Sequence, residues 1–159
     1  MLVGIIFFLL HTTSSHFVLK WPPSRGFDDE QAISPPCGGF NDISSPRIEW
    51  PATGGSIQLE LHHTQTNVSV LIAIKDDPGS SFSVFMRTSV TVEGLGSFCL
   101  DMIKVPTGVQ WLVGNEATIQ IVTNGDPGGG LYQVSFAWDT SSIRSWTSNS
   151  IRIAYNLTT

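Results

Sequence analysis

Charged side chains are scarce in this chain of 159 residues. It has 8 lysines and arginines and 13 aspartates and glutamates, and charged residues make up 13% of the chain. The formal net charge of −5 leaves no basic stripe that could pair with phosphates, which argues against nucleic acid as a partner. The chain also lacks an amphipathic helix of useful length, whereas turn-forming residues are abundant, with 15 glycines and 9 prolines. This composition favours strands joined by turns.

No apolar run reaches the ~20 residues that a transmembrane helix needs. The run from Leu2 to Leu10 is too short, and small residues follow it, with Thr13 and Ser15 at the positions that a signal peptidase reads. Although the usual basic start is missing, this pattern is typical of a secretory signal peptide. We therefore predict that residues 1–15 are a signal peptide and that the mature protein is secreted, or extracellular, and begins at His16. The alternative is cleavage elsewhere, with His16 an ordinary strand residue.

Alternating apolar residues and frequent turns predict the fold. Residues 57–64 alternate between an apolar face, which includes His63, and a polar face, which includes His62. Residues 68–74 alternate in the same way, and turn signals separate further β-rich runs. Before them, residues 24–48 form a long irregular segment of the kind that often carries function. We expect an all-β protein, a single antiparallel β-sandwich with long loops.

Cysteine is scarce as well, since only Cys37 and Cys99 are present. In a secreted protein these two are expected to form one disulfide, and the alternative is a pair of unpaired buried thiols. Two N-glycosylation sequons, which begin at Asn67 and Asn156, are consistent with export.

The four histidines offer the constellation best suited to chemistry. His11 lies in the predicted signal peptide, which leaves His16, His62 and His63. An N-terminal histidine carries a free α-amine and an imidazole, and a second imidazole would complete three nitrogen donors in one plane, which suits Cu(II). The amine must lose its proton to bind, so affinity should fall in acid. The alternative to metal binding is that His63 is a core residue at the end of a strand and His62 a solvated surface residue.

Other polar residues carry no enzyme motif. The sequence has no convincing nucleophile elbow, and the acidic pairs Asp28-Asp29 and Asp76-Asp77 are interpreted as solvated turn residues. We interpret Arg25, which lies between two turn-forming residues in the long irregular segment, as a structural residue that anchors that segment to a carboxylate. A hydrolase is therefore not expected.

The predicted mature N-terminus resembles a known family. The run from His16 to Asp28 reads HFVLKWPPSRGFD, and the run from Pro36 to Phe40 reads PCGGF. Both are similar to the start of the fungal copper acquisition factors, which are related to lytic polysaccharide monooxygenases (LPMOs). The similarity extends to Gln133 through three later stretches: His63–Thr66, Gly96–Leu100, and Ala117–Gln120 with Leu131–Gln133.

This resemblance implies an immunoglobulin- or fibronectin-like β-sandwich over residues 16–133 that binds one copper ion. His16 would supply its amine and a ring nitrogen, and His63 the second imidazole, with His62 as the fallback. The implied function is non-catalytic copper acquisition and homeostasis at the fungal cell surface, where a glycolipid (GPI) anchor typically holds family members. Copper is then the expected ligand. The expected partner is cell-wall polysaccharide or a membrane copper transporter, and the protein is expected to be a monomer.

The resemblance stops at Val134. The family has a Cys-Ala-Asp pattern whose aspartate is a further copper ligand, whereas this chain has Val134-Ser135-Phe136, so Phe136 takes the place of the aspartate. Asp139 lies on the opposite face of the strand, about 10 Å further on. Residues 134–159 are therefore predicted to be a divergent tail, either of a degenerate paralogue or of a translated intron. The tail contains no hydrophobic stretch, so an anchor signal is not expected in this chain.

Two other functions stay open from the sequence. The same histidines suit a copper-dependent polysaccharide monooxygenase. Such an enzyme would release oxidised oligosaccharides when it is supplied with a reductant. A metal-free cell-wall adhesion module is the third interpretation, and it predicts a mature N-terminus other than His16.

Overall fold

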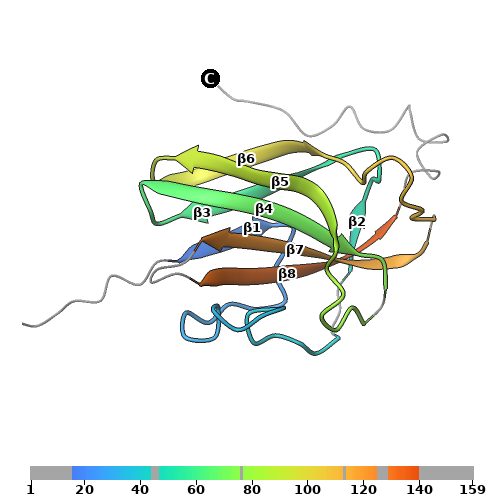
Figure 1. Cartoon of the computed structure of the whole chain (residues 1–159), viewed down its shortest axis with the longest axis horizontal. Helices are drawn as coiled ribbons and strands as arrows, with labels where there is room; N and C mark the ends of the chain where they lie inside the picture. Colours follow the sequence, from blue (N-terminus) through green and yellow to red (C-terminus); the bar gives the residue numbers. More distant parts are fainter. Residues whose placement is uncertain (1–15, 44–46, 76, 113, 125–128, 140–159) are drawn as a thin grey trace, which may run out of the picture.

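The structure is a computed structural model that describes residues 16–43, 47–75, 77–112, 114–124 and 129–139 (Figure 1). These residues form the strands β1 (Phe17–Trp21), β2 (Ile48–Trp50), β3 (Gly55–Leu61), β4 (Gln65–Ala73), β5 (Val84–Glu93), β6 (Gly96–Ile103), β7 (Glu116–Asn124) and β8 (Gly130–Asp139). No helix that could cross a membrane occurs in the described part of the chain. The signal peptide predicted at residues 1–15, the tail at residues 140–159 and its sequon at Asn156 all lie outside the described residues.

The strands form two sheets, and the predicted all-β antiparallel sandwich is confirmed. One sheet has three strands in the order β1-β3-β6, and the other has five in the order β2-β8-β7-β4-β5. Every pairing between described strands is antiparallel except that of the short β2 with β8.

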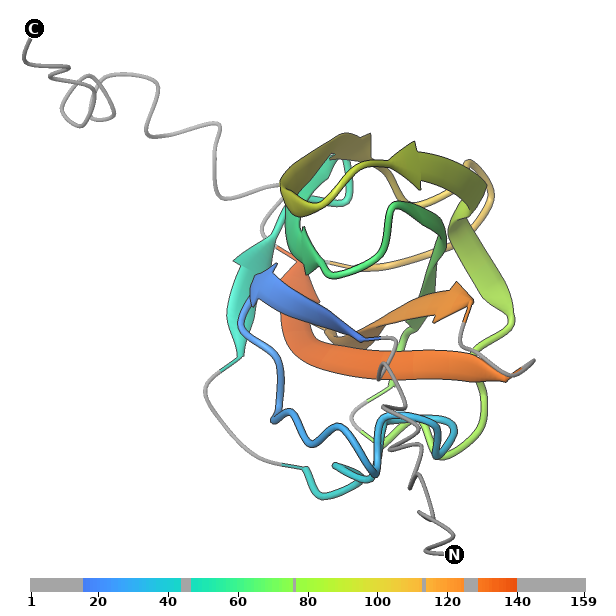
Figure 2. The same cartoon turned by 90° about the vertical axis from the view of Figure 1, so that its left-hand side faces the viewer.

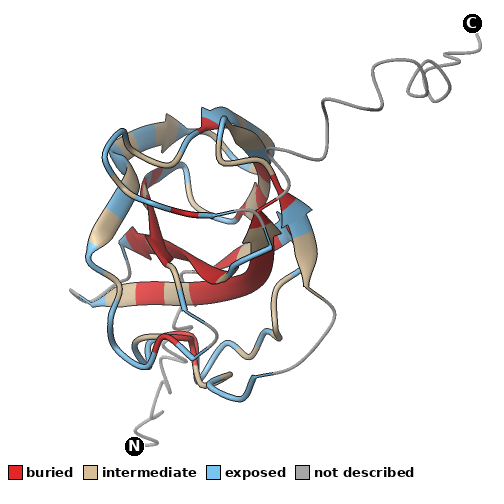
Figure 3. Ribbon diagram, turned by 90° about the vertical axis from the view of Figure 1, so that its right-hand side faces the viewer, coloured by how far each residue is buried: buried red, intermediate tan, exposed pale blue. Residues whose placement is uncertain are grey.

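The hydrophobic core lies between the two sheets, and strand periodicity explains its composition (Figure 3). In β3, Ile57, Leu59 and Leu61 are buried and alternate with more exposed polar residues, as predicted. Strand β4 faces them with Val68, Val70 and Ile72, all fully buried. Removing such a side chain from water contributes roughly 1.5–3 kcal/mol to folding, so this alternation fixes which face of each strand points inward.

Strands β7 and β8 are buried on both faces, because residues 22–43 cover the outer face of the five-stranded sheet (Figure 2). Hydrogen bonds attach this covering segment to the strands beneath it. The Gln120 side chain of β7 donates to the carbonyl of Pro36 (2.6 Å), and the backbone N–H of Tyr132 in β8 donates to the carbonyl of Ala32 (2.8 Å). The long irregular segment predicted from the sequence therefore acts as a third layer.

A bulge in β1 changes the direction of one tryptophan. Leu19 pairs with Leu59, but Trp21 pairs with Gln58, so the register shifts by one residue. Because side chains alternate with a period of two, this shift moves Trp21 from the core face to the outer face, where it is 47% exposed.

Strand β8 crosses the boundary predicted after Gln133 without a break. It pairs with β7 from Gly130 to Trp138, and Phe136 is 3% exposed. Residues 134–139, the first part of the predicted divergent tail, are thus an inner strand of the five-stranded sheet.

Candidate metal centre

The rings of His16 and His62 lie side by side, with their centroids 4.3 Å apart and their planes inclined by 36°. The strand register places them there. Phe17 pairs with Leu61 in the antiparallel β1–β3 pair, so the residue before Phe17 lies opposite the residue after Leu61. Two imidazoles from segments far apart in the sequence therefore meet at the end of the sandwich where β1 begins, which faces the viewer in Figure 2.

His63, the residue predicted to supply the second imidazole, is not the one against the His16 ring. Its Nε2 atom is buried and has no hydrogen-bond partner among the described residues, whereas His62 is exposed. The structure thus brings His16 together with the fallback residue, His62. The reason is the register, because successive residues point in opposite directions and only the first one after β3 lies opposite His16.

An aspartate and an aromatic ring from the covering segment adjoin the histidine pair. Asp29 Oδ1 lies 3.6 Å from His16 Nδ1, and the ring of Phe27 lies 6.0 Å from the His16 ring, centroid to centroid. Asp29 is exposed and lies in a turn, which fits the sequence interpretation of Asp28-Asp29 as solvated turn residues, and Asp28 Oδ1 accepts hydrogen bonds from the backbone N–H groups of Glu30 and Gln31. Asp29 was missed because the path of an irregular segment leaves no periodic signal.

Glu60, two residues before His62, is already paired. Its carboxylate lies 2.6 Å from Lys20 Nζ, and this hydrogen bond, together with the lysine charge, holds the pKa of Glu60 below its ordinary value. Asp29 is therefore the better candidate for a carboxylate donor beside the histidines.

Gln133 of β8 supports the strand that carries His16. Its side chain is 2% exposed and spans the core to β1. There its Oε1 accepts a hydrogen bond from the Leu19 N–H (2.9 Å) and its Nε2 donates to the Phe17 carbonyl. These two bonds hold β1, the strand that follows His16, to the five-stranded sheet. The sequence interpretation did not identify this role of Gln133.

Arg25 anchors the covering segment, as the sequence interpretation expected, but the contacts below go to carbonyl and hydroxyl oxygens instead of the expected carboxylate. Its backbone N–H donates to the carbonyl of Val134 (2.9 Å), and its Nη2 donates to Thr118 Oγ1 (2.9 Å) on β7. Nη1 donates to the carbonyls of Phe40 and Asn41. Because Phe27 and Asp29 follow Arg25 closely, this anchor helps to fix their position beside His16.

The position where the resemblance implied a ligand aspartate lies away from the histidines. The Phe136 ring contacts two guanidinium groups, with Arg25 Cζ 3.5 Å and Arg47 Cζ 4.8 Å from its centroid. An aspartate at this position would face two arginines. Asp139 lies at the far end of β8, where its Oδ1 accepts a hydrogen bond from the Ala52 N–H (3.3 Å).

The two cysteines are free, so the expected Cys37–Cys99 disulfide is not present. The fold explains why: Cys37 is buried in the covering segment on the five-stranded sheet, whereas Cys99 is exposed on β6 of the other sheet. Burial raises the pKa of the Cys37 thiol, and Asp77 adds to this, while the nearby Arg25 partly offsets it.

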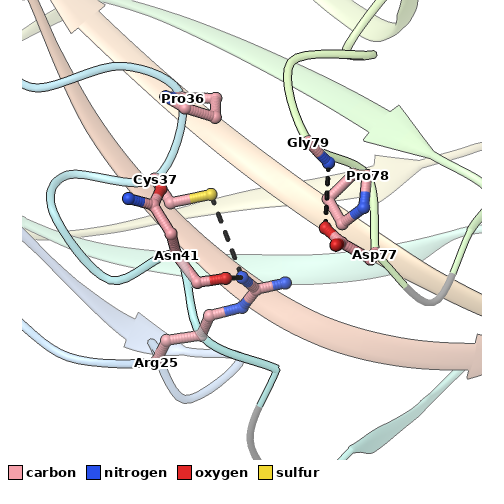
Figure 4. A pocket seen from close by; sticks show the side chains of 7 residues that line it. All are labelled: Arg25, Pro36, Cys37, Asn41, Asp77, Pro78 and Gly79. Atoms are coloured by element: carbon pink, nitrogen blue, oxygen red, sulfur yellow. Dashed lines mark hydrogen bonds between the residues drawn. The ribbon is translucent and has the colours of Figure 1, made fainter.

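Cys37 and Arg25 also line a cavity of about 370 Å³ (Figure 4). Arg25 Nη1 lies 3.9 Å from Cys37 Sγ, and the side chain of Asp77 lies across the cavity. No histidine lines this cavity, so it is separate from the His16–His62 pair.

The free cysteines lead to a prediction for thiol labelling. In the native protein near pH 8, Cys99 should react quickly with iodoacetamide and Cys37 slowly, since a buried thiol with a raised pKa forms little thiolate. Mass spectrometry of peptides after timed labelling measures both rates, and denaturant should make Cys37 reactive. If neither thiol labels in unreduced, unfolded protein, the two cysteines are joined after all.

The side chains around His16 provide part of a metal site. The described residues contain no group of three or more histidine, cysteine, aspartate or glutamate side chains already arranged to hold an ion. Two imidazoles are adjacent and one carboxylate lies close to them. A further nitrogen donor, the α-amine of His16, exists only once the bond to Ser15 has been cut.

Comparison with known proteins identifies the family. A model of BIM1-like copper acquisition factors matches residues 14–149, which extends past Gln133. An uncharacterized protein of Aspergillus fumigatus is 38% identical over 124 residues, which cover 75% of this chain and 51% of the relative.

Two further relatives have descriptive names. Copper acquisition factor BIM1 of Cryptococcus neoformans var. grubii is 31% identical, with 78% of this chain and 60% of the relative covered. The lytic polysaccharide monooxygenase-like protein ham-7 of Neurospora crassa is 29% identical, with 75% and 61% covered. The chain thus spans about half to three fifths of the length of these relatives. Since the family model matches most of the chain, the protein belongs to the BIM1-like copper acquisition factors.

Proposed function

We propose that the mature chain, beginning at His16, is a secreted protein that binds one copper ion in copper acquisition and catalyses no reaction. The observation that carries the proposal is the contact between the rings of His16 and His62, 4.3 Å apart at the start of β1. Family membership supports the choice of metal.

The donors near His16 suit copper. After cleavage, the His16 amine, a His16 ring nitrogen and a His62 ring nitrogen would give three nitrogen donors, a set that favours Cu(II). Two donors held at about 2 Å from one ion lie no more than about 4 Å apart. The 3.6 Å between Asp29 Oδ1 and His16 Nδ1 is within this limit, so Asp29 can add an oxygen donor. Asp29 thereby takes the role that the resemblance gave to the position of Phe136.

The proposal makes copper binding depend on removal of residues 1–15. Before cleavage, the His16 nitrogen is a peptide nitrogen and a poor donor, so the precursor would offer only side chains. Secretion would then both deliver the protein outside the cell and complete its site. Outside the cell, the exposed His62 could exchange the ion with a membrane copper transporter, and a monomer would suffice for this.

The decisive experiment compares two N-termini. The full chain is expressed in a yeast secretion host, and intact-mass measurement identifies the first residue, which should be His16. Calorimetric titration with Cu(II) should show one ion bound per chain. A matched variant with one alanine inserted before His16 should bind at least about 10-fold more weakly, because the amine is displaced while both rings remain. Equal affinity of the two proteins would contradict the proposal.

A copper monooxygenase is the second candidate, and two observations favour it. Several relatives are named LPMO-like, among them ham-7. In addition, the Phe27 ring lies 6.0 Å from the His16 ring, and an aromatic side chain near the copper is typical of LPMOs. Incubating the copper-loaded protein with chitin or cellulose and a reductant separates the two functions, since only the monooxygenase releases oxidised oligosaccharides.

A further inference from the structure

We propose that Asn67 carries an N-linked glycan that covers the edge strand β5. The proposal rests on the secretion included in the proposed function, because this modification occurs in the secretory pathway. The sequon Asn67-Val68-Ser69 lies on β4. Val68 points into the core and is fully buried, so Asn67 and Ser69 share the outer face of the five-stranded sheet, where Asn67 is exposed.

One hydrogen bond orients the Asn67 side chain, and a second one holds its backbone. Its Oδ1 accepts a hydrogen bond from Thr91 Oγ1 (2.8 Å), and its backbone N–H donates to Asn124 Oδ1 (2.6 Å). The amide Nδ2 has no hydrogen-bond acceptor among the described residues. A sugar on Nδ2 therefore leaves the bond to Thr91 intact.

The covalent step needs a lipid-diphosphate-linked oligosaccharide as donor. The Asn67 nitrogen forms a bond to the anomeric carbon of the first sugar, and the bond from that carbon to the diphosphate oxygen breaks. The lipid diphosphate leaves, and the amide loses one proton, so no oxidant or reductant is required.

The location of Asn67 suggests what the glycan does. Strand β5 is the outermost strand of its sheet, next to β4 alone, and it extends from Val84 to Glu93 (Figure 1). It also exposes half of the Phe85 side chain. A long exposed edge offers unpaired backbone groups to a second copy of the chain, and proteins commonly block such edges. Because Asn67 pairs with Thr91 of β5, a glycan rooted there lies beside this edge.

Secretion from yeast and intact-mass measurement test the modification. The wild-type chain should lose mass on treatment with an N-glycan-specific endoglycosidase. Asn67→Gln and Ser69→Ala, which both destroy the sequon, should lack that glycan, whereas Ser69→Thr should keep it. Asn156→Gln separates any contribution of the second sequon. If wild type and Asn67→Gln from the medium differ in mass only by the one methylene group of the substitution, this proposal alone is overturned, whereas a chain kept inside the cell with residues 1–15 attached would overturn secretion as well.

Sedimentation velocity tests the covering of the edge. The enzymatically deglycosylated protein should self-associate at concentrations where the glycosylated protein is monomeric. A charged residue on β5, introduced at the exposed Ser89 as Ser89→Lys, should restore the monomer without the glycan. If the deglycosylated protein stays monomeric at every concentration, the glycan does not protect β5.

Discussion

The His62→Ala variant of the mature protein is expected to bind Cu(II) at least about 100-fold more weakly than wild type, while His63→Ala keeps nearly the wild-type affinity. Removing a residue that only supports a metal ligand typically lowers metal affinity about 10–100-fold, so removing a ligand itself should lower the affinity at least as much. The two histidines are neighbours in sequence, yet only the ring of His62 lies against that of His16. Competition titration against a chelator of known affinity measures both variants.

Folding must be controlled in this comparison, because His63 is the more buried of the two. Thermal unfolding of each apoprotein shows whether a variant is folded at the temperature of the titration. Asp29→Asn, which keeps the shape of the side chain and removes its charge, should weaken binding less than His62→Ala does. If His63→Ala abolishes binding and His62→Ala does not, the second ligand is the one that the family resemblance implied, and the site differs from the present arrangement.

Gln133→Leu is expected to lower the free energy of unfolding by about 2–6 kcal/mol. The substitution keeps the approximate size of the side chain but leaves the Leu19 N–H and the Phe17 carbonyl buried without their partner. Each unsatisfied buried group costs about 1–3 kcal/mol. Urea denaturation followed by tryptophan fluorescence measures the loss.

Gln58→Leu is the matched control for this substitution. Gln58 also lies on a strand, but its side chain is on the outer face of β3 and is only half-buried. Its replacement should change stability by less than about 1 kcal/mol, because surface substitutions rarely do more. Equal effects of the two substitutions would show that the Gln133 hydrogen bonds do not hold β1 to the sheet.

Local periodicity was sufficient to predict the sandwich. Ile57, Leu59 and Leu61 alternate strictly with polar residues, and the structure buries all three. Trp21 breaks the same rule, because a bulge shifts its register relative to β3. A bulge depends on the pairing of two strands, so the sequence of one strand does not reveal it.

The candidate site was predictable only in part, for a similar reason. The position of His16 directly after the predicted signal peptide singled it out without any knowledge of the fold. The choice between His62 and His63 depended on the register of β1 against β3, which neither sequence segment contains by itself. Asp29 comes to His16 from an irregular segment, and Gln133 bonds to β1 from the opposite sheet. Neither contact produces a periodic pattern in the sequence.

The covering segment, residues 22–43, limits how this domain can be shortened or grafted. Surface connections usually tolerate insertions and deletions, and designers remove them first. Here the segment is joined to β7 and β8 through Arg25 and Gln120, and its removal would expose polar groups that now have partners. A minimal form of this domain should therefore keep this stretch whole.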